Sequence, residues 1–202
     1  GLTAFTVGDM NTRGGSISLD TSGVIGVTTI GTTINADNGA SNPGDVSLAF
    51  GLMGYDAAGA PGAIAVTGTN VSVDLSSALA APTDDMTYTV EESFAFTGSA
   101  VVNSGSHTIM PAGTALAISL DSSGARDDAI TVTNTAGNAT QITVQGDLGN
   151  DGTSGDTVTI NSAGVAKAIS VNASGVSQGS MDIAGGTLVD TIVGGGDDDV
   201  IT

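Results

Sequence analysis

Short segments in which apolar and polar residues alternate fill most of this chain, and they constrain its fold more than any other feature. Alternation with a period of two is typical of β-strands that bury one face. Glycine, asparagine, aspartate or proline bounds most of the segments, and these residues favour turns. The segments read GSISLD, GVIGVTTIGTTI, DVSLAF, AIAVTG, VSVDL, MTYTVEESFAF, AISLD, AITVTN, TQITVQG, DTVTIN and AISVNA. Helical periodicity is nearly absent, so we predict an all-β protein.

One strand-and-turn segment occurs twice. ISLDTSGV begins at Ile17, and ISLDSSGA begins at Ile118, 101 residues later. A spacing of about ten residues between strands fits either β-sandwiches or a solenoid. We interpret the repetition as one or two β-sandwich-like modules, residues 1–82 and 83–184, and the repeated segment favours a relation of the second to the first. Chance repetition in a chain rich in serine and glycine is the alternative.

The apolar residues are numerous enough for a sizeable core, but few of them are aromatic. Hydrophobic residues make up 40% of the sequence, aromatic residues only 3%, and tryptophan is absent. The core must therefore consist of valine, isoleucine, leucine and alanine. Phe94 and Phe96 alternate on one face, which favours a core position for both. No stretch approaches eighteen apolar residues, so we predict no membrane span.

Acidic residues dominate the charge of the chain. Three lysines and arginines stand against 21 aspartates and glutamates, which gives a formal net charge of −18. Nucleic acid is excluded as a partner because almost nothing can neutralise phosphates. An anionic membrane surface is disfavoured for the same reason. The acids cluster in turns that contain glycine or asparagine, which suits a hard cation. A solvated acidic surface, or adaptation to salt, is the alternative.

The residues needed for most catalytic sites are missing. The chain has no cysteine and a single histidine, His107, so it lacks the ligands of a zinc or thiolate site. Residues 175–179, GVSQG, match the nucleophile-elbow pattern around Ser177, but no helix and no histidine follow. We predict that His107 lies in a surface turn and that the protein is not an enzyme.

The last eighteen residues divide into two nine-residue segments with one pattern. Residues 185–193 read GGTLVDTIV, and residues 194–202 read GGGDDDVIT. Both follow G-G-x-G-x-D-x-U-x, where U is apolar, except that Leu188 and Asp197 occupy the fourth position. This pattern resembles the calcium-binding nonapeptide repeat of the RTX family.

The resemblance implies the start of a parallel β-roll over residues 185–202. In that family, six residues of each repeat form a turn whose aspartate and carbonyl oxygens hold calcium, and three form a short strand. Ile192 and Ile201 would then be buried and stacked above one another. Since a solenoid needs about three repeats, we expect the chain to continue past Thr202 or neighbouring loops to complete the site. The calcium ligands predicted here are Asp190, Asp197, Asp198 and Asp199.

Two other acidic loops are candidate calcium ligands. DLGNDGTSGD offers oxygen ligands but does not match an EF-hand loop, because positions three and twelve lack ligands. DSSGARDD offers a second set, although Arg126 could instead pair with one of its carboxylates. Solvated turns are the alternative for each cluster. The candidates are Asp147, Asn150, Asp151 and Asp156 in the first loop, and Asp121, Asp127 and Asp128 in the second.

These observations favour a non-catalytic extracellular protein that uses Ca²⁺. The RTX resemblance implies export, as from Gram-negative bacteria, and a composition rich in threonine, serine and glycine is typical of surface-layer and filament subunits. We therefore expect a subunit that self-assembles into a filament or surface layer with calcium, with copies of itself as partners. The alternative is an adhesin or carbohydrate-binding module of a large RTX-type protein, with a cell-surface glycan as its partner.

Overall fold

The computed structural model describes residues 2–37, 43–57, 64–82, 84–99, 103, 106–121, 129–147, 149 and 157–202. Within these ranges the chain forms strands and no helix, and therefore nothing long and apolar enough to cross a membrane as a helix. The expectation of an all-β fold is confirmed. The strands are β1 (Phe5–Val7), β2 (Met10–Asn11), β3 (Ile17–Asp20), β4 (Thr28–Ile30), β5 (Thr33–Asn35), β6 (Val46–Ala49), β7 (Tyr55–Ala57), β8 (Ile64–Asp74), β9 (Met86–Thr97), β10 (Ser106–Pro111), β11 (Ala115–Asp121), β12 (Ala129–Thr133), β13 (Gln141–Asp147), β14 (Thr157–Asn161), β15 (Ser170–Val176), β16 (Ser180–Ala184), β17 (Thr191–Val193) and β18 (Val200–Ile201).

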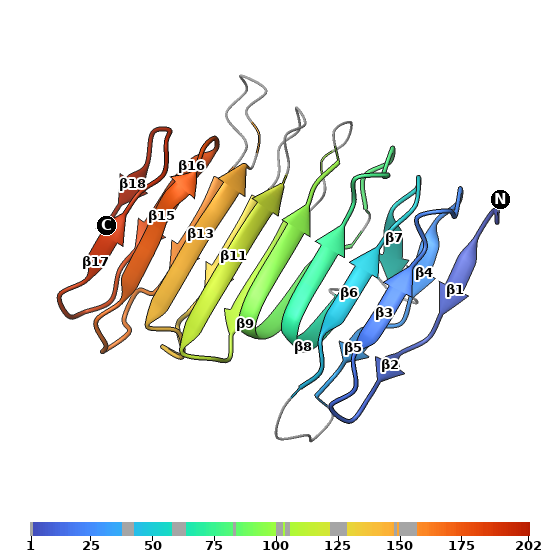
Figure 1. Cartoon of the computed structure of the whole chain (residues 1–202), viewed down its shortest axis with the longest axis horizontal. Coiled ribbons are helices and arrows are strands. Elements are labelled where there is room, and N and C mark those ends of the chain that lie inside the picture. Colours follow the sequence, from blue (N-terminus) through green and yellow to red (C-terminus); the bar gives the residue numbers. More distant parts are fainter. Residues whose placement is uncertain are drawn as a thin grey trace.

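The strands are stacked as a parallel β-solenoid. Every pair of neighbouring strands in the described residues is parallel. Each coil of the chain adds its strands beside those of the coil before, from the N-terminal to the C-terminal end (Figure 1). The expected parallel β-roll is thus part of a longer solenoid-like stack, whereas the sandwich-like modules are not confirmed.

Two long faces make up the body of the solenoid. The first face contains β2, β5, β10, β12, β14, β16 and β18, and the second contains β3, β6, β11, β13, β15 and β17. Strands β8 and β9 belong to both faces, and their pairing shifts register between Gly68 and Asn70. We place the bend between the faces at this β-bulge, because an extra residue bends a strand. A small third sheet, β1-β4-β7, lies at the N-terminal end.

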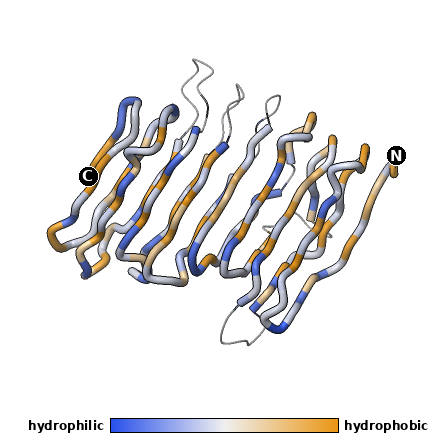
Figure 2. Tube along the Cα trace, viewed as in Figure 1, coloured by the Kyte–Doolittle hydropathy of each residue, from blue (hydrophilic) through white to orange (hydrophobic). Residues whose placement is uncertain are grey.

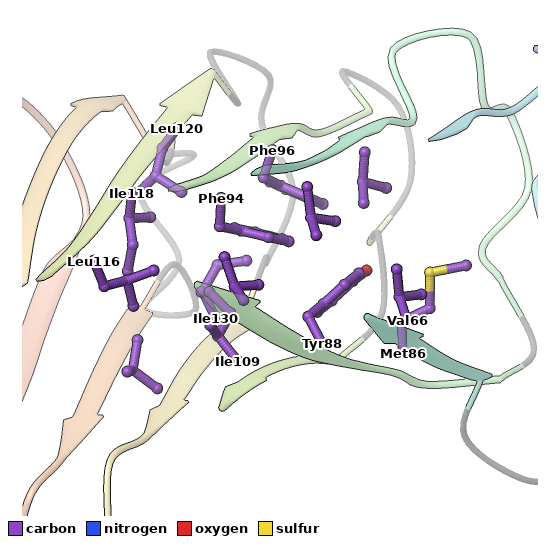
Figure 3. Close-up of a cluster of buried hydrophobic side chains, with 14 of the residues drawn as sticks. Val66, Met86, Tyr88, Phe94, Phe96, Ile109, Leu116, Ile118, Leu120 and Ile130 are labelled. Carbon is purple, nitrogen blue, oxygen red and sulfur yellow. The ribbon is translucent and has the colours of Figure 1, made fainter. Parts of the chain in front are cut away.

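The core lies between the two faces and follows the alternation of the sequence. Hydropathy changes repeatedly along the strands (Figure 2), and alternate strand residues are buried. Phe94 and Phe96 are at most 1% exposed, which confirms their predicted core position. They pack near Tyr88 among aliphatic side chains from neighbouring coils (Figure 3). This arrangement accounts for a large core with few aromatic residues.

The repeated ISLD segments occupy the same column of the second face. Ile17 pairs with Val46, Val46 with Val71, Val71 with Phe94, and Phe94 with Ile118. The two segments are therefore four coils apart in one ladder. Strand pairing also runs across the expected module boundaries, since β8 pairs with β9, and β15 and β16 pair with β17 and β18. Whether residues 1–82 and 83–184 are separate folding units stays a prediction.

The two nonapeptides form the last strands of the two faces. Ile192 of β17 pairs with Val171 on the second face, and Ile201 of β18 pairs with Ile183 on the first. The prediction that Ile192 and Ile201 are buried and stacked on each other is therefore wrong. Each nonapeptide supplies half a coil. Ile201 therefore lies 18 positions after its partner Ile183, while Ile192 lies 21 positions after its partner Val171. Ile192 is partly buried against the core, and Ile201 is 51% exposed.

The predicted surface position of His107 is also wrong. His107 lies in β10, between Met86 and Ile130 of the neighbouring strands, and is fully buried. It belongs to the inward-facing set of its strand, with Ile109, while Thr108 between them points outward. A histidine fits this position because a buried tyrosine hydroxyl hydrogen-bonds its ring.

Candidate calcium-binding turns

Asp190 and Asp199 make equivalent hydrogen bonds in the two nonapeptide turns. Oδ1 of Asp190 accepts the backbone N–H of Ile169 at 2.7 Å, and Oδ2 accepts that of Gly186 at 2.7 Å. Oδ1 of Asp199 accepts the N–H of Met181 at 3.0 Å, and Oδ2 accepts that of Gly195 at 2.8 Å. Each carboxylate thus links its own turn to the preceding coil of the same face.

The first glycine of each nonapeptide leaves the space that the carboxylate needs. A Cβ atom on Gly185 would lie 2.3 Å from Oδ2 of Asp190, and one on Gly194 would lie 2.1 Å from Oδ2 of Asp199. Contacts this short are not tolerated, so a side chain at either position would displace the carboxylate. The G-G-x-G-x-D pattern therefore has a steric basis in this chain.

The three consecutive aspartates, Asp197 to Asp199, do not share one environment. Oδ2 of Asp197 accepts the N–H of Gly179 at 3.0 Å, while Asp199 bonds to Met181 and Gly195. Asp198 is exposed to solvent. Backbone N–H groups, which carry partial positive charge, therefore face two of the three carboxylates and offset part of their mutual repulsion.

Asp121 and Asp147 are direct neighbours at the ends of β11 and β13. They belong to a column on the second face whose members occupy one register position in successive coils. The column consists of Asp20, Ala49, Asp74, Thr97, Asp121 and Asp147. Several of its carboxylates accept an N–H two residues later, as Asp147 does from Gly149 at 2.9 Å. The sequence predicted Asp121 and Asp147 separately, and the structure brings them together.

Those predicted ligands that the structure describes do not all lie together. The chain passes from the second face to the first after β11, β13 and β17, so the ends of these strands lie along one edge of the solenoid (Figure 1). Asp121 and Asp147 are the last residues of β11 and β13, and the Asp197–Asp199 turn follows β17. Asp190 precedes β17 and lies at the opposite edge. The described residues contain no group of three or more acidic or histidine side chains that could hold a metal ion by themselves. Five predicted ligands lie outside the described residues: Asp127, Asp128, Asn150, Asp151 and Asp156.

The oxygen donors of the nonapeptide turns are of the kind that calcium binds. An ionised carboxylate has about four lone-pair sites, and the amide bonds of Asp190 and Asp199 use two on each. Calcium takes carboxylate and backbone carbonyl oxygens together. Asp190 and Asp199 could therefore hold the ion with carbonyl oxygens of their turns, and bound calcium would supply positive charge that the chain lacks.

Asp74 and Asp20 were not predicted as site residues, although the sequence carries a signal for both. Each is followed two residues later by a serine, as is Asp121 in DSS. Oδ1 of Asp20 accepts the N–H and the hydroxyl of Ser22 at 3.0 and 2.6 Å, and Oδ1 of Asp74 accepts the N–H of Ser76 at 2.8 Å. The Ser22 hydrogen bonds lower the pKa of Asp20 below its usual value. The Asp-x-Ser spacing thus occurs at the ends of β3, β8 and β11, although Asp45-Val46-Ser47 shows it at the start of β6.

Comparisons with protein-family models, with curated proteins and with solved structures find no match to this chain.

Proposed function

We propose that this chain is a non-catalytic structural subunit that self-assembles, with calcium, into an extracellular filament or surface layer. The observation that carries the proposal is the equivalence of Asp190 and Asp199, whose carboxylates sit in the same way in two consecutive nonapeptide turns. A repeated carboxylate whose lone pairs are not all used by amide N–H groups is suited to a hard cation.

The stacked fold supports a structural role. A parallel solenoid buries one continuous core, and each coil packs against its neighbours. Such a body presents long, regular faces on which copies of a subunit can meet. These properties serve mechanical strength and assembly, and they need no reaction chemistry.

The charge of the chain supports a requirement for calcium. Copies with a formal charge of −18 repel one another, and this repulsion is strongest at low ionic strength. Calcium at the acidic turns would lower that charge and stiffen the C-terminal coil. Extracellular calcium is plentiful, so assembly would follow export.

Negative-stain electron microscopy of the purified chain, with calcium and after EDTA, tests the proposal. We expect ordered polymers with calcium and dispersed particles after chelation. The double variant Asp190→Asn and Asp199→Asn should fail to assemble with calcium. Asp182→Asn is the control. Asp182 is exposed on β16, so this substitution also removes a carboxylate, but one that lies outside the nonapeptide turns.

Two results would contradict the proposal. One is a wild-type chain that stays dispersed at all calcium concentrations. The other is a polymer that survives EDTA unchanged. A monomer that binds glycans in calcium would instead assign the chain to the adhesin class.

A further inference from the structure

The outward residues of the first face form a surface rich in threonine. On β5, β8, β9, β10, β12 and β14, buried residues alternate with outward ones. We call the outward set the threonine face. It consists of Thr33, Asn35, Ala65, Thr67, Thr87, Thr89, Ser106, Thr108, Met110, Ala129, Thr131, Thr133, Thr157, Thr159 and Asn161.

The threonines of this face are aligned from coil to coil. Thr87 pairs with Thr108, Thr108 with Thr131, and Thr131 with Thr159. A second column begins with Thr67 and Thr89. Neighbouring strands lie about 4.8 Å apart, and alternate residues of one strand about 6.6 Å apart. The residue positions of this face are therefore regularly spaced, and threonine is the commonest residue among them.

The threonine face carries no charged residue, which sets it apart in this acidic chain. The charges nearest to it are Glu91 and Glu92, at the bend of β9, and Asp182 on β16. The outward positions of the second face, by contrast, include Asp20, Asp74, Asp121 and Asp147. Two copies of the chain can therefore approach closely on the threonine face without bringing like charges together, and on the second face they cannot.

An apolar side chain stands within the threonine face. Met110 is 41% exposed and lies beside Thr89 in the ladder. A flexible methionine that is surrounded by small residues with hydroxyl groups is suited to packing against another protein surface. It also interrupts the threonine column, which disfavours a lattice of ordered water as the occupant.

The size of the face suits a weak contact that is repeated in an assembly. Six strands about 4.8 Å apart, with five residues of about 3.3 Å each, span roughly 450 Å² per copy. Two such faces together bury roughly 900 Å², which is below the usual range of stable interfaces and within that of weak or transient ones. Hydroxyl groups are both donors and acceptors, so the face is complementary to itself.

We infer that the threonine face is the lateral contact between copies of this chain in the assembly. The inference rests on the proposed function, which is self-assembly, and it names the surface through which the copies contact each other. Two threonine faces would pack with their sheets about 10 Å apart, with Met110 of each copy among the hydroxyl groups of the other. Calcium at the turns and contact on this face are separate requirements, because the two sets of residues do not overlap.

Charge variants test this surface in the full chain. Thr131→Glu adds a carboxylate to the threonine face, and Ser119→Glu adds one to an outward position of the second face. We expect association of Thr131→Glu with calcium to be about 100-fold weaker than that of the wild type, since like charges would face each other. Ser119→Glu should assemble as the wild type does. Circular dichroism and thermal melting establish that both variants are folded.

Single-cysteine variants give a second, independent measurement, because the natural chain has no cysteine. Thr108→Cys and Thr131→Cys should be joined between copies when the calcium-loaded protein is treated with a bismaleimide whose span is about 10 Å, the expected distance between the two sheets. Ser119→Cys should remain monomeric on a denaturing gel. If Thr131→Cys cross-links no more than Ser119→Cys, the inference is overturned even when a variant used in the charge test fails to fold.

The outcomes separate this inference from the proposed function. A wild-type chain that never assembles rejects both. A wild-type chain that assembles, together with a folded Thr131→Glu variant that assembles equally well, rejects the threonine face and leaves the proposed function standing. Inhibition of ice growth by the monomer, lost in Thr131→Glu, would assign the face to ordered water and also overturn the inference.

Discussion

The hydroxyl of Tyr88 lies 2.7 Å from Nδ1 of His107, and both side chains are fully buried. The two rings are stacked with centroids 5.8 Å apart, and Phe94 and Phe96 pack against the pair. Tyr55, the other tyrosine of the chain, has a buried hydroxyl with no hydrogen-bond partner among the described residues. The core therefore contains one satisfied and one unsatisfied tyrosine hydroxyl, which makes their energetic contributions separable.

Tyr88→Phe should destabilise the protein by about 1–3 kcal/mol, because it removes a hydrogen-bond partner from a buried imidazole nitrogen. Tyr55→Phe is the matched control, and we expect it to be neutral or stabilising since it removes an unsatisfied buried hydroxyl. Urea unfolding followed by circular dichroism measures both free energies of unfolding. Equal losses in the two variants would contradict the assignment of the Tyr88–His107 hydrogen bond.

Alkaline pH should unfold the protein through its tyrosines. Burial raises the pKa of Tyr88 well above its usual value, and burial together with Asp85 and Asp84 raises that of Tyr55. In the unfolded chain both hydroxyls ionise near pH 10. The stability that depends on neutral tyrosine is therefore complete below about pH 10 and is lost as the pH rises further. Tyrosinate absorbance and the loss of β-sheet signal should appear together. Ionisation without unfolding would show that the tyrosines are accessible.

Gly194→Ala should loosen the last half coil, because the new Cβ would lie 2.1 Å from Oδ2 of Asp199. The displaced carboxylate would release the N–H groups of Met181 and Gly195. Hydrogen exchange of the Met181 amide should therefore become faster. Gly23→Ala is the control, since a Cβ there has no atom within 4 Å. Unchanged protection of Met181 in Gly194→Ala would show that Asp199 does not hold this turn.

The alternation in the sequence was sufficient to predict strands and inward residues, but not how the strands pair. Phe94 and Phe96 alternate in the same way whether their strand joins an antiparallel sandwich or a parallel solenoid. The coils also differ in length: Thr33 pairs with Ala65, 32 positions away, whereas Ile183 pairs with Ile201, 18 positions away. Unequal turns conceal the period, so the repeat at Ile17 and Ile118 suggested modules rather than coils.

Residue type and local spacing were sufficient to predict some residues of the candidate site, but not those that strand pairing brings together. The positions of Asp190 and Asp199 follow from the nonapeptide pattern, whose glycines leave room for the carboxylates. The pairing of Asp121 with Asp147 depends on which strands become neighbours, and no local pattern shows this. His107 was mispredicted because its partner, Tyr88, comes from the previous coil.

Calorimetric titration of the full chain with calcium tests the central claim most directly. We predict saturable calcium binding by the wild type and by Asp182→Asn, and its loss or marked weakening in the variant that combines Asp190→Asn with Asp199→Asn. Binding that the double variant retains in full, or a wild-type chain that takes up no calcium, would contradict the account.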